Sequence, residues 1–378
     1  MCITGLMRGG KMNLCQIYNS AAHYRKEIFL LIDQTYNSDY VFGVLKRDIR
    51  QMETHELRGK VTRVQNNWWR GFYWQPTVQS LLTKDYDTFL VLGDTRCLST
   101  WLFCIRARLF HRRKRIFFWS HGWYGKETKV EKFLKKIFFR LPNGGTFLYG
   151  NYSRNLMIKE GFNPDKLFVI HNSLAYSKQY ALRNKLHAED VYQNHFGNNY
   201  PNLFFVGRLT KVKKLDMAIR ALAICKEDGH HFNLSFIGDG EAKKELIKLT
   251  EELGIADRVW FYGACYDEAE LGRMIFNADL CVSPGNVGLT AMHSMVFGTP
   301  VITHNDFPHQ MPEFEAIHEG VTGSFYEYGN VDSLANSIVE WFADHQGRRE
   351  EVRQACYHEI DTQWTPQFQL EVLKKHLS

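Results

Sequence analysis

Two basic side chains in one turn have the chemistry to hold a diphosphate. In the stretch FFVGRLTKVKKLD an apolar, strand-like run ends at Gly207, and Arg208 and Lys213 follow it just before a helical pattern. Backbone amides at the start of a helix favour an anion, an arginine offers a planar fork to phosphate oxygens, and a lysine adds a point charge. The turn therefore predicts a site that grips a diphosphate and stabilises it as a leaving group.

Further glycine turns follow this one along the chain. FIGDGE places Gly238 and Gly240 after the next strand-like run, VWFYG ends at Gly263, and SPGNVGLTAMHSMVFGTPVI begins at Ser283. An isolated basic turn is more often a capped helix beside solvated side chains. The whole series, in this order, indicates a ligand site instead.

A regular framework has to position these turns. From residue 203 onward, short apolar runs alternate with segments of helical periodicity, and the first half repeats the pattern less regularly. Such alternation requires mostly parallel sheets with helices on both faces, and 378 residues are too many for one compact core. We expect an α/β protein of two Rossmann-like domains that face a central cleft, with ligands at the carboxyl ends of the strands. The expected boundaries are a first domain at 12–175, a polar linker at 176–200, a second domain at 201–347 and a helical tail at 348–378.

The motifs between residues 203 and 342 resemble the donor-binding half of a glycosyltransferase of family 4, which has the two-domain GT-B fold. In the first half the resemblance is limited to WSHGWYG and LFVIHNSL. The family implies transfer of a sugar from a nucleotide-sugar donor to an acceptor, normally with retention of the anomeric configuration. It also implies no bound metal and no cofactor, the substrate itself being a nucleotide sugar of the UDP or GDP type.

The resemblance assigns roles to individual residues of this sequence. Arg208 and Lys213 match the family's basic pair on the donor phosphates, and His121 matches a histidine that contacts the transferred sugar. These three are the predicted catalytic residues, and His23 and Arg25 are predicted on the acceptor side. The predicted donor-binding residues are Gly207, Gly238, Gly240, Gly263, Tyr266, Asn286, Gly288, Leu289, Thr290 and His293.

Two acidic positions of the family pattern hold other residues here. Most members carry two glutamates separated by seven residues, and these align with Gly285 and His293. A histidine can hydrogen-bond a ribose hydroxyl as donor or acceptor, whereas Gly285 has no side chain and Asn286 beside it supplies no negative charge. Asp306 and Glu313 in the following loop are candidates for the missing carboxylate, and the stereochemical outcome stays open.

Positive charge is concentrated in one part of the first half. Residues 101–140 hold twelve Lys or Arg and two Glu, a net charge of +10 against +6 for the whole chain. In KVEKFLKKIFFRL the apolar residues fall at helical spacing between these bases. The pattern is typical of a helix on an anionic membrane surface, with an ordinary surface helix as the alternative. No nucleic-acid-binding motif accompanies the charge, so we expect no nucleic-acid partner.

Composition favours a cytoplasmic protein. No apolar run reaches the roughly 18 residues that cross a bilayer, and the N-terminus has no signal-peptide pattern. The eight cysteines are scattered without metal-binding spacing, as expected of a reducing compartment. Any membrane attachment should therefore be peripheral, on the inner face of the cell membrane.

The leading hypothesis is a hexosyltransferase that acts on a glycan or lipid-linked acceptor in the synthesis of surface polysaccharide, such as capsule or the O-antigen of lipopolysaccharide. One alternative is a partner subunit that binds a nucleotide sugar without turnover, since the acidic pair is absent. The other is a sugar-nucleotide epimerase on the same two-domain scaffold.

Overall fold

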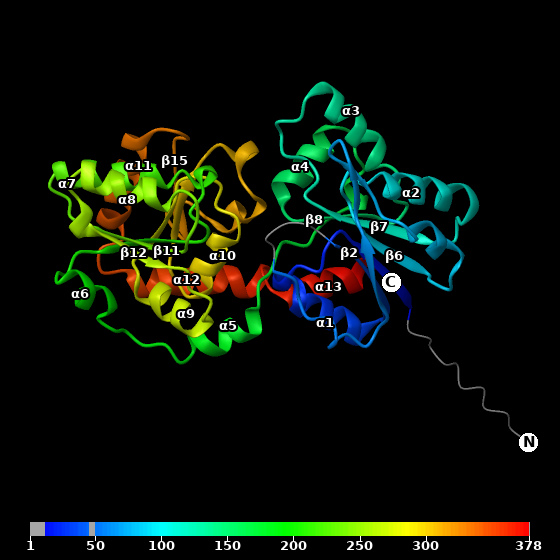
Figure 1. Cartoon of the computed structure of the whole chain (residues 1–378), viewed down its shortest axis with the longest axis horizontal. Helices are drawn as coiled ribbons and strands as arrows, with labels where there is room; N and C mark the ends of the chain where they lie inside the picture. Colours follow the sequence, from blue (N-terminus) through cyan, green and yellow to red (C-terminus); the bar gives the residue numbers. More distant parts are fainter. Residues whose placement is uncertain (1–11, 45–49, 378) are drawn as a thin grey trace, which may run out of the picture. The chain divides into compact units, whose positions relative to one another are not determined.

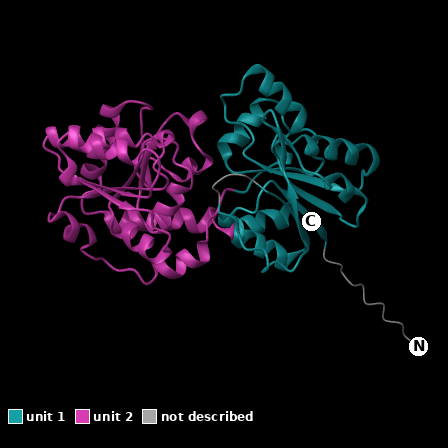
Figure 2. Ribbon diagram, viewed as in Figure 1, with its two compact units in different colours: residues 1–170, 369–378 teal, residues 171–368 magenta. Residues whose placement is uncertain are grey.

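A computed structural model describes residues 12–44 and 50–377 of the chain. It divides into two compact units (Figure 2), which we call unit 1 (residues 1–170 and 369–378) and unit 2 (residues 171–368). Each unit is built around its own parallel sheet. The prediction of two Rossmann-like α/β domains is confirmed.

Unit 1 contains a seven-stranded sheet in the order β3-β2-β1-β6-β7-β8-β9, in which every pairing is parallel. Its central strands are almost entirely buried, because apolar runs such as TFLVL pack on both faces of the sheet. An antiparallel hairpin, β4–β5, lies apart from this sheet. The strands are β1 (Asn13–Tyr18), β2 (Asn37–Val44), β3 (Val61–Gln65), β4 (Asn67–Trp69), β5 (Phe72–Trp74), β6 (Thr88–Leu92), β7 (Arg115–Ser120), β8 (Gly145–Leu148) and β9 (Leu167–Val169).

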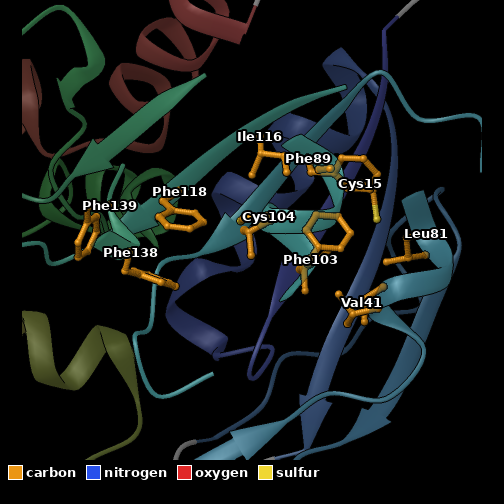
Figure 3. Close-up of a cluster of buried hydrophobic side chains, with 14 of the residues drawn as sticks. Cys15, Val41, Leu81, Phe89, Phe103, Cys104, Ile116, Phe118, Phe138 and Phe139 are labelled. Carbon is orange, nitrogen blue, oxygen red and sulfur yellow. The ribbon is translucent and has the colours of Figure 1, made fainter. Parts of the chain in front are cut away.

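Helices cover this sheet and complete its core (Figure 1). On one face, Phe103 and Cys104 pack with Phe89 of β6 and with Phe118 of β7, as Figure 3 shows. The rings of Phe118 and Phe138 stack at a centroid distance of 4.6 Å. The helices of unit 1 are α1 (Lys26–Thr35), α2 (Leu98–Phe110), α3 (Lys129–Phe138) and α4 (Asn151–Lys159).

Unit 2 contains a six-stranded parallel sheet in the order β12-β11-β10-β13-β14-β15. Its strands are β10 (Asn202–Val206), β11 (Asn233–Ile237), β12 (Val259–Gly263), β13 (Leu280–Ser283), β14 (Val301–His304) and β15 (Gly323–Tyr326). Helices α5 (Tyr176–Arg183) and α6 (Val191–Phe196) precede these strands along the chain. The other helices of unit 2 are α7 (Leu215–Glu227), α8 (Lys243–Glu252), α9 (Glu268–Asn277), α10 (Leu289–Val296), α11 (Val331–Asp344) and α12 (Arg349–Gln363), and α13 (Pro366–Leu377) runs from unit 2 into unit 1.

Both sheets have a point where the strand order reverses. In unit 1 the chain builds outward from β1 in one direction and from β6 in the other, and in unit 2 the same happens at β10 and β13. The loops that leave two such strands diverge, so a crevice opens at their carboxyl ends, where α/β proteins of this type bind ligands. These two switch points are the places to look for sites.

The domain boundaries differ from the expected ones in two places. Residues 176–200, expected as a linker, form α5 and α6 and belong to unit 2, because their polar side chains have specific partners. Arg183, for example, forms a two-pronged ion pair with Asp361. The end of the expected tail, from Gln369 onward, packs into the core of unit 1 through leucines of α13.

Candidate functional site

The basic turn of unit 2 lies at its switch point, directly after β10. Gly207 has a φ of +143°, which L side chains rarely adopt, and this lets the chain leave the strand at once. Arg208 is exposed and makes no ion pair with any residue that the structure describes. A short 3-10 helix, Lys211–Lys213, then brings Lys213 back beneath the loop that follows β13.

Lys213 is held by that second loop. Its Nζ donates to the backbone carbonyl of Asn286 over 2.7 Å and to the side-chain Oδ1 over 2.9 Å. Burial lowers the pKa of Lys213 to about 8; the carboxylate of Glu313 opposes this shift, and the charge of Arg208 adds to it. The ammonium is therefore preorganised for an anion but close to losing its proton above neutral pH.

The amino end of α10 lies at the same switch point, after β13. Gly288 precedes the helix with a φ of +52°, and the amides of Leu289 and Thr290 form its first turn. Unpaired amides at this end of a helix attract phosphate oxygens. The hydroxyl of Thr290 donates to the carbonyl of Val206 over 3.0 Å, so it ties α10 to the end of β10.

The glycines of FIGDGE have a steric reason to be there. A Cβ on Gly238 would lie 1.8 Å from the carbonyl oxygen of Gly207, and one on Gly240 would lie 2.3 Å from that of Leu209. These backbones pack in direct contact, and Leu209 donates its amide to Asp239. Gly238 and Gly240 therefore position the basic turn, and this role does not depend on any contact that they make with a ligand.

Gly285 lies where no side chain fits. A Cβ there would come within 2.4 Å of the carbonyl oxygen of Val212 and 2.8 Å of Cα of Lys213, and the amide of Gly285 donates to the carbonyl of Lys213. The basic turn thus covers the position that holds a glutamate in most members of the resembled family. A glutamate at position 285 would therefore clash with the backbone of the basic turn.

A carboxylate approaches the same loop from another segment. Glu313 is 2% exposed, and its Oε1 accepts from Nδ2 of Asn172 over 2.8 Å, while Oε2 is buried without a hydrogen-bond partner. Burial raises the pKa of Glu313, and the contacts with Asn172 and Lys213 work against that rise. Asp306, the other candidate, instead pairs with His309 over 2.7 Å.

His293, which stands at the position of the family's second glutamate, also has a carboxylate as its neighbour. Nε2 of His293 lies 3.4 Å from Oε1 of Glu268, which also accepts from Gln179 over 2.7 Å. Burial opposes ionisation of Glu268, but the contacts with His293 and Gln179 outweigh it, and the pKa of Glu268 is lowered. The sequence contains no signal for this pairing, since α9 and α10 meet only in the fold.

The remaining residues predicted on the donor side lie in the loop after β12. Gly263 has a φ of +97°, and Tyr266 is 88% exposed. No described residue joins either of them to Arg208 or Lys213 by a hydrogen bond or ion pair.

His121 of unit 1 lines a crevice at that unit's own switch point. Burial, followed by the charges of Arg25 and Lys135, lowers the pKa of His121 to about 4, so the ring is neutral at physiological pH. Arg25 lines the same crevice, whereas His23 is exposed and its ring bonds the carbonyl of Arg50. Over residues 12–44 and 50–377, no cluster of three or more His, Cys, Asp or Glu could hold a metal ion.

Comparison with known proteins agrees with this geometry. Residues 188–358 match the family model for glycosyl transferases group 1. The matched segment contains the complete switch point of unit 2. The chain is also 24% identical over 197 residues to an uncharacterized 41.2 kDa protein in the cps region of Klebsiella pneumoniae. That match covers 51% of this chain and 49% of the relative, so the chain spans about half of the relative's length.

Solved structures of other proteins share the fold over nearly the whole chain. The lipopolysaccharide outer core galactosyltransferase WaaB in its apo form superposes with a TM-score of 0.71 at 15% identity, over 97% of this chain and 99% of WaaB. Anabaena Alr3699/HepE in complex with UDP superposes with a TM-score of 0.69 at 17% identity, over 96% and 99%. The protein therefore has the GT-B fold.

Proposed function

We propose that the protein is a glycosyltransferase that moves a hexose-type sugar from a UDP-sugar or GDP-sugar donor to a glycan or lipid-linked acceptor. One observation carries the proposal: Arg208, Lys213 and the amino end of α10 meet at the switch point of a group 1 domain. Fixed positive charge at this position stabilises a departing diphosphate without proton transfer. No metal is assigned to the step.

The setting of the reaction is proposed from the relatives. One is encoded in a cps region and another is a lipopolysaccharide galactosyltransferase, and a third binds UDP. These names support a role in surface-polysaccharide synthesis and favour UDP over GDP as the donor base.

The test is release of nucleoside diphosphate from a panel of sugar nucleotides, with and without glycan acceptors. We expect Arg208→Ala to lower kcat by about 10²–10³-fold, the range seen when one electrostatic stabiliser of a transition state is removed. Arg220→Ala is the matched control, because Arg220 is an exposed arginine of α7 that pairs only loosely with Asp216 at 4.0 Å. Turnover by Arg208→Ala at the wild-type rate would contradict the proposal.

A second candidate is a subunit that binds a nucleotide sugar without turnover. It is favoured by Gly285, where the packing of the basic turn leaves no room for the family's acid. This candidate predicts that UDP raises the melting temperature while no donor is consumed with any acceptor. Conversion of the donor into another nucleotide sugar, without an acceptor and without release of nucleoside diphosphate, would instead indicate an epimerase.

We propose further that unit 1 attaches to an anionic membrane surface. Thirteen large hydrophobic residues are exposed on the hairpin β4–β5 and on helices α2 and α3. They are Trp68, Trp69, Phe72, Trp74, Leu98, Leu102, Ile105, Leu109, Phe110, Val130, Phe133, Leu134 and Ile137. These elements are neighbours, since Tyr73 donates its amide to Arg96 just before α2, and Arg108 of α2 donates to the carbonyl of Arg140 just after α3.

Basic residues accompany this apolar surface. Arg112, Arg113 and Lys129 are exposed and make no ion pair with any described residue. Apolar side chains that enter the lipid boundary beside bases that face the headgroups are typical of a peripheral attachment. No helix in the described part of the chain is long and apolar enough to cross a membrane.

Flotation with liposomes tests the attachment. We expect binding to vesicles that contain anionic lipid and a decline in binding as salt rises, because the charge contribution is screened. The double substitution Phe133→Ser with Ile137→Ser should weaken binding by at least about tenfold, since burial of each side chain contributes about 1.5–3 kcal/mol. Val321→Ser, which alters an exposed residue of unit 2, is the control. Binding that neither salt nor the double substitution changes would contradict the proposal.

A further inference from the structure

A second crevice opens at the switch point of unit 1. Loops that follow β1, β6, β7 and β8 line a cavity of about 460 Å³, all within this unit. Its position corresponds to that of the diphosphate site in unit 2, because both lie where the strand order of a parallel sheet reverses. The chemistry of its lining shows which ligand it suits.

Four charged side chains line the crevice, and three of them are neutralised. Arg96 makes a two-pronged ion pair with Asp94, at 3.0 Å and 2.9 Å. Lys135 pairs with Glu127 over 2.7 Å. The fourth, Arg25, is only 6% exposed and forms no ion pair with any described residue. The crevice therefore has one buried positive charge without a counterion.

Aromatic rings surround this guanidinium in place of a carboxylate. Its Cζ lies 4.9 Å from the ring centroid of Tyr18 and 4.7 Å from that of Trp119. The guanidinium donates a hydrogen bond to the hydroxyl of Tyr149, and it also acts on the hydroxyl of Tyr18, whose pKa it lowers against the effect of burial. Cation–π contacts offset part of the desolvation of a buried charge, but a guanidinium has five N–H donors. Most of them stay available for a ligand.

The environment of His121 is consistent with an uncompensated charge. Nδ1 of His121 is buried without a hydrogen-bond partner. Arg25 is the largest charge acting on this ring, and it lowers the pKa of His121 beyond the effect of burial. An anion bound at Arg25 would neutralise this charge and could accept a hydrogen bond from the ring.

We propose that this crevice binds an anionic group of the acceptor, a phosphate or a carboxylate, through a two-pronged contact with Arg25. Oxyanions of this geometry match the planar fork of a guanidinium, and water exclusion strengthens the contact. The assignment of the anion to the acceptor rests on the proposed glycosyltransferase function. The donor diphosphate has its own cations in unit 2.

The test measures binding of small probes to the full-length protein by NMR titration. Glucose 1-phosphate and glucuronate present the two anions, and glucose is the neutral match. We expect at least one anionic sugar to bind about tenfold or more tightly than glucose, and Arg25→Met to remove that advantage. The anionic sugar that binds then identifies the group as a phosphate or a carboxylate.

Control variants separate a lost contact from a damaged fold. Arg63→Met alters an exposed arginine that lies over Phe42, at 5.6 Å, and should leave probe binding unchanged. Arg25→Lys keeps the charge without the fork and should bind with intermediate affinity. Equal binding of the anionic sugars and glucose, or anion binding that Arg25→Met retains, would overturn the proposal.

Two further measurements distinguish this proposal from the proposed function. UDP affinity should stay within about twofold in Arg25→Met, since the donor cations are Arg208 and Lys213. If glucose 1-phosphate binding is lost in Arg208→Ala but not in Arg25→Met, the phosphate lies in unit 2 and the acceptor site is wrong. If no UDP-sugar or GDP-sugar is turned over while Arg25-dependent binding persists, the proposed function fails and the anion site stands.

Discussion

Both units place basic residues at the switch point of their sheet, but the surroundings of these residues differ in burial and in counterions. In unit 2, Lys213 is buried, and the carboxylate of Glu313 stabilises its positive charge. Arg208 in the same turn is exposed. In unit 1, Arg25 is buried among rings with no carboxylate partner among the described residues. A guanidinium keeps its charge at any physiological pH, whereas burial brings the lysine ammonium close to deprotonation. The comparison thus predicts that only the unit 2 site changes its affinity for anions near neutral pH.

The largest expected effect comes from removing the lysine charge. Lys213→Met should lower turnover by about 10²–10³-fold, because a preorganised cation on the departing diphosphate is lost. Calorimetry should also show weaker UDP binding, with glucose 1-phosphate binding to unit 1 unchanged. Lys248→Met, at an exposed lysine of α8 that pairs with Glu252, is the control. If Arg25→Met weakened UDP binding as much as Lys213→Met, the two crevices would not be separate sites.

A smaller effect is expected on the pH dependence of UDP binding when Glu313, the carboxylate that acts on Lys213, is replaced. Lys213 is charged below its pKa of about 8 and neutral above it, so UDP affinity should fall as pH rises through about 8. Glu313 favours the charged lysine, so Glu313→Gln should move this decline to lower pH. The measurement is the UDP dissociation constant between pH 6 and pH 10. Lys213→Arg should abolish the decline, and a decline unmoved by Glu313→Gln would mean that Glu313 is uncharged in the folded protein.

The sequence predicted most of unit 2 because its signals are local. The alternation of strands and helices sets the fold, and the helical pattern expected after Lys213 is α7, which ends at Glu227 with Gly229 in a left-handed conformation just beyond. Arg208 and Lys213 lie only five positions apart, in a turn whose place after β10 fixes them at the switch point.

The parts that sequence reasoning missed depend on distant contacts. Glu313 and Asn172 are 141 positions apart, and the pairing of Glu268 with His293 needs two helices to pack. The burial of Arg25 cannot be read from NSAAHYRKEIF, since only Phe29 among its ring neighbours belongs to that stretch and the others come from β1, β7 and the loop after β8. Polar residues at 176–200 resemble a linker until their partners in unit 2 are known.

The return of α13 to unit 1 affects the order in which the protein matures. Leu370, Leu373 and Leu377 are buried against the sheet that starts with β1, and Arg115 donates to the last carbonyls of this helix. Translation releases β1 first and these leucines after all of unit 2. The core cluster that α1 shares with α13 is therefore complete only after residues 369–377 leave the ribosome, so unit 1 finishes folding after unit 2 has been synthesised.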